Sequence, residues 1–237
     1  MQVKGNGQGW ERRRALVGLV GVAAASLWVK SAWAGAYEDF FAALRRDDMR
    51  ALEQLRVRGF DLNTVDESGQ PPLLLAIRLQ AWRAATFLVE QPGVDLDARN
   101  ASGENALMLA ALRGRIELLR RLLDRGAEVN QPGWAPLHYA AAHAGAVDGA
   151  GAEMVALLLE HSAYIDAESP NGTTPLMMAA RYGEAGAVRV LLESDADPTL
   201  RNQQRLGALE FATAAGRESV ARLIARALRA RLGPASW

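Results

Sequence analysis

The chain has 237 residues, of which 50% are hydrophobic and 6% aromatic, and its 27 basic residues equal its 27 acidic ones. It contains no cysteine, which excludes disulfides, thiolate catalysis and cysteine-ligated metal sites. Abundant alanine and leucine with few aromatic residues favour packed helices over sheets.

The N-terminal segment has the pattern of an export signal. Three arginines at 12–14 precede an apolar run from Ala15 to Val29, and the triplet Ala32-Trp33-Ala34 follows. A basic region, an apolar region and a small-x-small site in this order predict a signal peptide cleaved after Ala34. The run is shorter than the roughly 18–20 apolar residues that span a bilayer. We therefore expect a periplasmic or secreted protein without membrane insertion, and retention of residues 1–34 as an anchor is the alternative.

The export route stays open. The paired arginines resemble a twin-arginine signal, but no Phe-Leu-Lys follows them, so general secretion fits equally well. Residues 1–34 hold five basic residues and one acidic residue, so the remaining chain has a net charge of about −4, and all of its basic residues are arginine. A mildly acidic chain without a basic face argues against nucleic-acid binding.

A motif recurs through the rest of the chain with a mean period of 34 residues. Each copy has leucine in its second position and alanine in its fifth. The copies begin at Pro72, Ala106, Pro136, Pro175 and Ala208. A second marker keeps the same period, because a leucine-rich segment ends each time at a turn-forming residue. These residues are Gly59, Gly93, Gly126, Ser162 and Asp195.

This pattern predicts a pair of short helices in every repeat. Proline suits the first helical turn, and the leucine and alanine of the motif share one helical face. Gly114, Gly183 and Gly216 are expected to break the chain between the helices, because glycine accepts a left-handed backbone. No single repeat can bury its own apolar faces, so neighbouring repeats must stack.

The pattern resembles the ankyrin repeat, which is a β-turn and two helices in about 33 residues. The resemblance covers residues 36–232 and implies an all-α solenoid of stacked helix-turn-helix units with short β-turn or hairpin connections. We expect a signal peptide at 1–34, an ankyrin-repeat domain at 35–232 and a tail at 233–237. Within the domain we expect an N-terminal cap at 36–63, internal repeats at 64–97, 98–130, 131–166 and 167–200, and a C-terminal cap at 201–232.

The third internal repeat departs from the others in two places. The turn before Pro136 is three residues shorter than its counterpart before Ala106, and a glycine-rich insert from His143 to Gly151 separates the helices. Loops that depart from a regular scaffold often carry function. Neutral drift in a surface loop is the alternative.

Nothing in the sequence predicts a catalytic, cofactor or metal site. The resemblance places His138 at the histidine of the Thr-Pro-Leu-His motif, where it hydrogen-bonds backbone between units. His143 and His161 have no metal-ligand spacing. Acidic residues at the turns are expected to make local hydrogen bonds; they are Asp61, Asp95, Asp97, Asp166 and Asp197.

The resemblance implies binding of a partner protein through turn tips and the exposed side of the first helices. The positions it indicates are Arg78, Leu112, Arg113, Trp134, His143, Asn171, Arg181 and Tyr182. Arg78, Arg113 and Arg181 would form a row that faces an acidic partner; alternatively, each pairs with a neighbouring carboxylate. Trp134 is either exposed for binding or covers the shortened turn.

These observations favour a non-enzymatic, monomeric scaffold that binds a protein through a concave groove centred on the Trp134–His143 repeat. A peptide or small-ligand sensor, with the insert at 143–152 closing over a pocket, is the alternative. A hydrolase or metal enzyme on the same frame is the least favoured reading.

Overall fold

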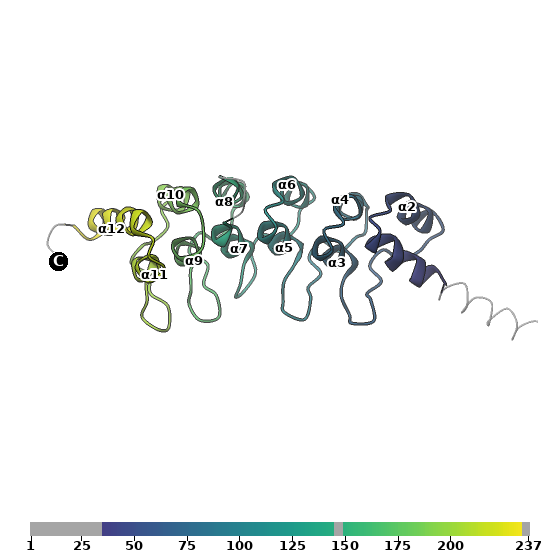
Figure 1. The fold of residues 1–237 in the computed structure, drawn as a ribbon, viewed down its shortest axis with the longest axis horizontal. Helices are drawn as coiled ribbons and strands as arrows, with labels where there is room; N and C mark the ends of the chain where they lie inside the picture. The colour runs from purple at the N-terminus through teal and green to yellow at the C-terminus, as the bar shows by residue number, and fades with distance from the viewer. Residues whose placement is uncertain (1–34, 145–148, 234–237) are drawn as a thin grey trace, which may run out of the picture. The chain divides into compact units, whose positions relative to one another are not determined.

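The computed structural model describes residues 35–144 and 149–233, and these residues form helices joined by turns, with no strand among them (Figure 1). The predicted signal peptide lies outside the described residues. Two compact units are distinguished, one that ends at Phe60 and one that begins at Asp61. The all-α class predicted from the repeat is confirmed.

The first unit is a helix pair with its own aromatic cluster. A helix over residues 35–45 is followed by α2, Met49–Val57. The Asp48 side chain accepts hydrogen bonds from the N–H groups of Arg50 and Ala51, both at 3.1 Å, and so caps α2. The Phe40 ring lies 4.7 Å from that of Phe60, centroid to centroid, and is fully buried.

The second unit contains five helix pairs. They are α3 (Pro72–Arg78) with α4 (Trp82–Glu90), α5 (Ala106–Leu112) with α6 (Ile116–Asp124), α7 (Pro136–Ala142) with α8 (Ala150–Glu160), α9 (Pro175–Arg181) with α10 (Ala185–Glu193), and α11 (Ala208–Ala214) with α12 (Glu218–Leu232). Within this unit the first helices form one row and the second helices another (Figure 1). The loops before the first helices project beyond their row, and we call them fingers. The fingers span 58–71, of which 61–71 belong to this unit, and 91–105, 125–135, 161–174 and 194–207.

The motif residues fill the core of this unit. The motif leucines from Leu73 to Leu176 are buried, while Leu209 in the last repeat is half-buried. The alanine three positions later is fully buried in every repeat, where its small side chain allows close packing of neighbouring first helices. These alanines are Ala76, Ala110, Ala140, Ala179 and Ala212.

The residue that ends each second helix has a left-handed backbone, as the second marker predicts. Gly59, Gly93 and Gly126 have φ values of 83°, 84° and 81°, and the non-glycine residues Ser162 and Asp195 have 65° and 69°. The conformation is therefore kept even where a side chain makes it cost roughly 1–2 kcal/mol.

The expectation for Gly183 is wrong. Gly114 and Gly216 have φ values of 63° and 68°, but Gly183 is not left-handed. It is required for another reason: a Cβ atom at this position would lie 1.9 Å from the carbonyl oxygen of Ala141 in the preceding repeat. Gly183 thus permits a close approach between α7 and the end of α9.

The turn carboxylates divide into two sets, which make local hydrogen bonds and hydrogen bonds to the next repeat. The sequence predicted only the first set. Asp61, Asp95 and Asp197 accept hydrogen bonds from the N–H two residues later, as expected. Asp97 and Asp166 instead accept from the N–H of Glu128 at 2.7 Å and of Asp197 at 3.0 Å, each in the next repeat. The prediction of purely local bonds is wrong for these two residues, which link neighbouring repeats.

Arginine side chains add a second kind of link. The Arg217 guanidinium, at the start of α12, donates to the carbonyl oxygens of Ala179 at 2.7 Å and Ala180 at 3.0 Å, and also to that of Gly183. These are the carbonyls at the end of α9, where a cation complements the helix dipole. Burial lowers the pKa of Arg217 from its ordinary value.

Within the described ranges no helix has the length and apolar character needed to cross a membrane.

Candidate protein-binding surface

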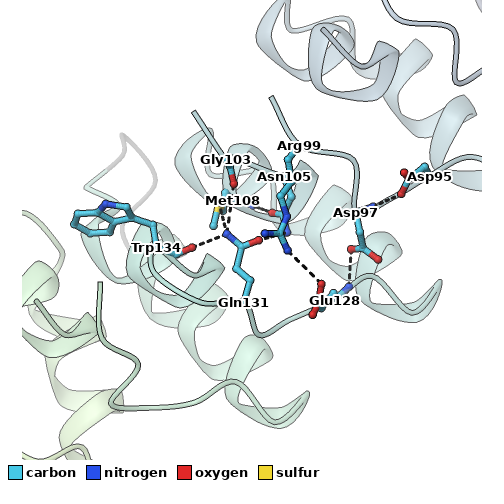
Figure 2. A network of polar contacts seen from close by, with 9 residues as sticks. All are labelled: Asp95, Asp97, Arg99, Gly103, Asn105, Met108, Glu128, Gln131 and Trp134. Carbon is cyan, nitrogen blue, oxygen red and sulfur yellow. Dashed lines mark hydrogen bonds and ion pairs between the residues drawn. The ribbon is translucent and has the colours of Figure 1, made fainter. Parts of the chain in front are cut away.

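The finger at 125–135 differs from the other four, as its shortened sequence predicts. In the longer fingers one N–H donates to the carbonyl four residues later, and these donors are Asp66, Asn100, Ser169 and Asn202. In the short finger the Gln131 side chain closes the turn instead, because its Nε2 donates to the Trp134 carbonyl at 2.6 Å (Figure 2). The same Nε2 lies 3.5 Å from the Gly103 carbonyl of the preceding finger.

Because Gln131 closes the turn, Trp134 lies at the end of the short finger. The indole is 37% exposed, and its ring meets that of His138 edge-on with 5.2 Å between centroids. Of the two alternatives for Trp134, exposure therefore fits the structure. Figure 2 shows the indole pointing away from the polar network around Gln131.

His138 is fully buried and has the structural role that the motif implies. Its Nδ1 accepts a hydrogen bond from the Ala135 N–H at 3.1 Å. Nε2 must then carry the proton, and it donates to the Thr173 carbonyl in the next repeat at 2.9 Å. Burial lowers the pKa of His138, against the smaller opposite effect of its backbone hydrogen bonds. The neutral ring joins two repeats.

The C-terminal ends of the first helices present one exposed edge. We call it the first-helix ridge; it comprises Arg78, Leu79, Leu112, Arg113, His143, Arg181 and Tyr182. Leu112 and Tyr182 are each 50% exposed, and Leu79 is 46% exposed. The ridge combines cationic side chains with exposed apolar ones, and arginine and tyrosine are frequent energetic centres of interfaces.

Within the described part of the chain none of the three ridge arginines forms a direct ion pair with a carboxylate, although Arg78 interacts electrostatically with the nearby Asp66. Arg78 donates to the Gln70 amide oxygen at 2.8 Å, and the Arg181 guanidinium lies 5.1 Å from the Tyr182 ring centroid. Arg113 is exposed and forms no ion pair with a described residue. The row is also less regular than the sequence indicated, since Arg78 and Arg181 end their helices while Arg113 comes one residue after its helix.

His143 and Asn171 are less available than the other predicted positions. The half-buried His143 ring packs on Gly114, where an added Cβ would lie 2.7 Å from the ring Cε1 atom. The Asn171 carbonyl accepts from the Gln203 N–H at 3.0 Å, and its side chain accepts from the Ser169 hydroxyl at 2.6 Å. Both residues therefore take part in packing or in contacts between fingers.

The insert is anchored at its C-terminal end. The Glu184 carboxylate accepts from the N–H of Gly149 at 2.8 Å and of Gly151 at 3.2 Å, and so caps α8 from the next repeat. Residues 145–148 lie outside the described residues, so closure of the insert over a ligand stays a prediction.

Two features were missed by sequence reasoning. The Tyr139 hydroxyl donates to the Glu104 carboxylate at 3.2 Å, and burial, with the nearby charge of Glu104, raises the pKa of Tyr139 to about 12. Tyr164 is 69% exposed on the finger after α8. The described residues contain no group of three or more histidine or acidic side chains placed to hold a metal ion.

Comparison with known proteins gives the class of this fold. The family described as ankyrin repeats matches in three overlapping copies, over residues 40–132, 81–169 and 143–231. The chain belongs to the ankyrin-repeat family. An ankyrin repeat domain from Acinetobacter baumannii AYE has the same fold, with a TM-score of 0.67 and 24% identity over 79% of this chain and 96% of that chain.

Several long eukaryotic proteins contain a similar region. Neurogenic locus notch homolog protein 2 of Homo sapiens is 34% identical over 167 residues, which are 69% of this chain and 6% of that protein. Transient receptor potential cation channel subfamily A member 1 of Homo sapiens is 27% identical over 70% of this chain and 15% of its own length. The B-cell lymphoma 3 protein homolog of Mus musculus is 32% identical over 58% of this chain and 31% of its own length. The chain thus spans less than a third of each of these relatives.

Proposed function

We propose that this protein is a non-catalytic scaffold that binds an acidic surface of a partner protein through the first-helix ridge and Trp134. Ankyrin repeats typically serve as protein-binding scaffolds and are generally non-catalytic. Their fold does not name a partner, so the proposal rests on the surface. The observation that carries it is that Arg78, Arg113 and Arg181 are exposed and form no direct ion pair among the described residues, with Arg78 alone interacting electrostatically with the nearby Asp66 carboxylate.

That observation gains weight from the arginines elsewhere in the protein. Arg99 pairs with Glu128 of the next finger, and Arg120 and Arg121 on α6 pair with Glu153 on α8 and Glu90 on α4, respectively. The ridge arginines lie instead beside exposed Leu112 and Tyr182. Charge-assisted bonds to carboxylates, surrounded by apolar contact, are a frequent means of protein recognition.

A pull-down from the exported fraction tests the surface. Substitution of Arg113, Trp134 and Tyr182 by alanine together is expected to abolish recovery of the partner that the wild-type chain captures, because it removes a guanidinium and two aromatic anchors. A matched variant with Arg189, Arg222 and Arg226 replaced by alanine removes more positive charge from the second helices and is expected to retain the partner. Circular dichroism checks that both variants keep their helices.

The assignment is wrong if the ridge variant recovers the partner as well as the wild type does. It is equally wrong if the matched variant loses the partner to the same extent, because recognition would then depend on net charge rather than on the ridge.

We further propose that the scaffold acts in the periplasm or outside the cell. The support is the order of arginines, apolar run and Ala32-Trp33-Ala34 triplet. Intact-mass spectrometry of the protein recovered from the exported fraction is expected to show a mature N-terminus at Gly35. A full-length mass in that fraction, or retention of the chain in the cytoplasm, would contradict cleavage and export respectively.

A further inference from the structure

A groove separates the short finger from the finger that follows it. It has a volume of about 610 Å³, and its walls include Val129 and Pro132 on the short finger and Tyr164 and Ala167 on the next one. The short finger contributes residues 128–133 to the groove, and it lacks the backbone hydrogen bond that closes the turn of each longer finger. It is distinct from the first-helix ridge, whose residues do not line it.

Tyr164 is an unusual residue for its place in the repeat. The equivalent residue is acidic in the other fingers of the second unit: Asp61, Asp95, Glu128 and Asp197. Three of these carboxylates close a local turn, as described above. Here a tyrosine with a 69% exposed side chain stands instead. Tyr164, the aromatic residue at this position, therefore lines the same groove as the short finger.

The backbone that carries Tyr164 is held firmly. The Asn130 side chain accepts from the Tyr164 N–H and donates to the Ser162 carbonyl, each at 2.8 Å. Asn130 belongs to the short finger, so these two bonds fix the spacing between the walls. A preformed groove loses little conformational entropy when a ligand enters it.

The charges at the groove have one sign. Glu128 and Glu168 both line it and are exposed. Glu128 pairs with Arg99 at 3.4 Å, and the Glu168 carboxylate has no hydrogen bond or ion pair within the described ranges. His161 also lines the groove. An aromatic face beside two exposed carboxylates, of which only Glu128 is already paired, complements a cation with an apolar stem.

From this arrangement we propose that the groove binds an arginine side chain on an extended segment of a partner protein. The guanidinium stacks on Tyr164 and pairs with Glu168 and Glu128, while the flanking residues contact Val129 and Pro132. Arginine is favoured over lysine because its planar group stacks on an aromatic ring and pairs with carboxylates in a fixed geometry. The site is separate from the ridge and of opposite charge.

A titration followed by NMR tests the proposal on the chain from residue 35 onward, which carries all the groove residues. The probe is a blocked pentapeptide with arginine at its centre, flanked by leucine and glycine on each side. The control peptide carries citrulline in place of arginine, because citrulline has the shape of arginine without the charge. The arginine peptide is expected to shift the amide signals of 128–133 and 161–168 and to bind about tenfold more tightly than the citrulline peptide, as the sum of an ion pair and a cation–π contact.

The peptide affinities of two variants distinguish binding at this groove from general attraction between opposite charges. Tyr164→Asp restores the acidic residue of the other repeats and adds a negative charge, yet it is expected to weaken binding about threefold because the aromatic face is lost. Arg222→Ala, on α12 and outside the groove, removes a positive charge and is expected to leave the peptide affinity unchanged. The proposal is overturned if the citrulline peptide binds equally well, if Tyr164→Asp binds as tightly as the wild type, or if the shifted signals lie elsewhere. Absence of binding at millimolar peptide concentrations overturns it as well.

Discussion

Gly183→Ala is expected to destabilise the protein by about 3 kcal/mol, at the upper end of the usual cost of overpacking. The added Cβ would lie 1.9 Å from the Ala141 carbonyl oxygen and 2.9 Å from the Ala179 Cα. Both neighbours are backbone atoms, so no side-chain rotation relieves the clash. The helices α7 and α9 would have to separate.

The position is sensitive for a further reason. The Gly183 carbonyl also accepts a hydrogen bond from the Arg217 guanidinium of the C-terminal repeat. A shift of this segment would therefore disturb packing toward Ala141 on one side and the helix cap provided by Arg217 on the other. Loss of helical signal during urea unfolding, measured by circular dichroism, gives the free-energy change.

Gly216→Ala is the matched control. Gly216 occupies the corresponding link between helices in the last repeat, has φ of 68°, and has open space where a Cβ would be. Its substitution introduces backbone strain of roughly 1–2 kcal/mol without a clash. If Gly183→Ala costs no more than Gly216→Ala, the close approach between α7 and α9 does not limit stability.

His138→Phe is expected to lower stability by about 1–3 kcal/mol, because it leaves the Ala135 N–H buried without a partner. The Thr173 carbonyl loses one of its two hydrogen bonds and keeps the one from the Ser169 N–H at 3.0 Å. Phenylalanine keeps an aromatic ring of similar size, so most of the loss reports the two hydrogen bonds at 3.1 and 2.9 Å. The free energy of unfolding of both proteins at pH 7.5 measures the effect. A loss below about 0.5 kcal/mol, as for ordinary surface substitutions, would show that these bonds contribute little.

The same pair of proteins gives a pH dependence of known sign. Burial holds the pKa of His138 below its ordinary value near 6.5, so the unfolded chain takes up a proton more readily than the folded one. Protonation of the folded state would also remove the acceptor that Ala135 uses. The stability contributed by His138 is therefore complete above about pH 7 and is lost as the pH falls below about 6.5. The difference between wild type and His138→Phe should shrink between pH 7.5 and 5.5, and a constant difference would contradict this assignment.

The repeat period made most of the fold predictable. Paired helices, proline at the first helical turn and left-handed residues at the ends of the second helices all follow from local preferences that recur in each copy. The role of Gly183 was not predictable, because the clash it avoids involves Ala141, a residue of another repeat. The same reason explains why Asp97 and Asp166 were expected to bond locally, since their partners are 31 residues away.

The candidate binding surface was predictable only in part. Family resemblance indicates the ends of the first helices, and the structure exposes Arg113 and Tyr182 there. The family resemblance did not indicate that the His143 ring packs on Gly114 or that Asn171 forms a hydrogen bond with the next finger, because both contacts cross between repeats. Tyr164 could have been found by aligning the turn residues, where it stands alone among acidic ones.

The row of arginines along the first helices also sets a spacing that a partner has to match. Neighbouring packed helices lie about 8–10 Å apart, so Arg78 and Arg113, in adjacent repeats, are separated by about one such step, and Arg113 and Arg181 by about two. An extended chain advances about 3.3 Å per residue. A strand-like segment with a carboxylate, two other residues, a second carboxylate, five other residues and a third would meet all three guanidinium groups in register, and this arrangement can be sought in the sequences of captured proteins.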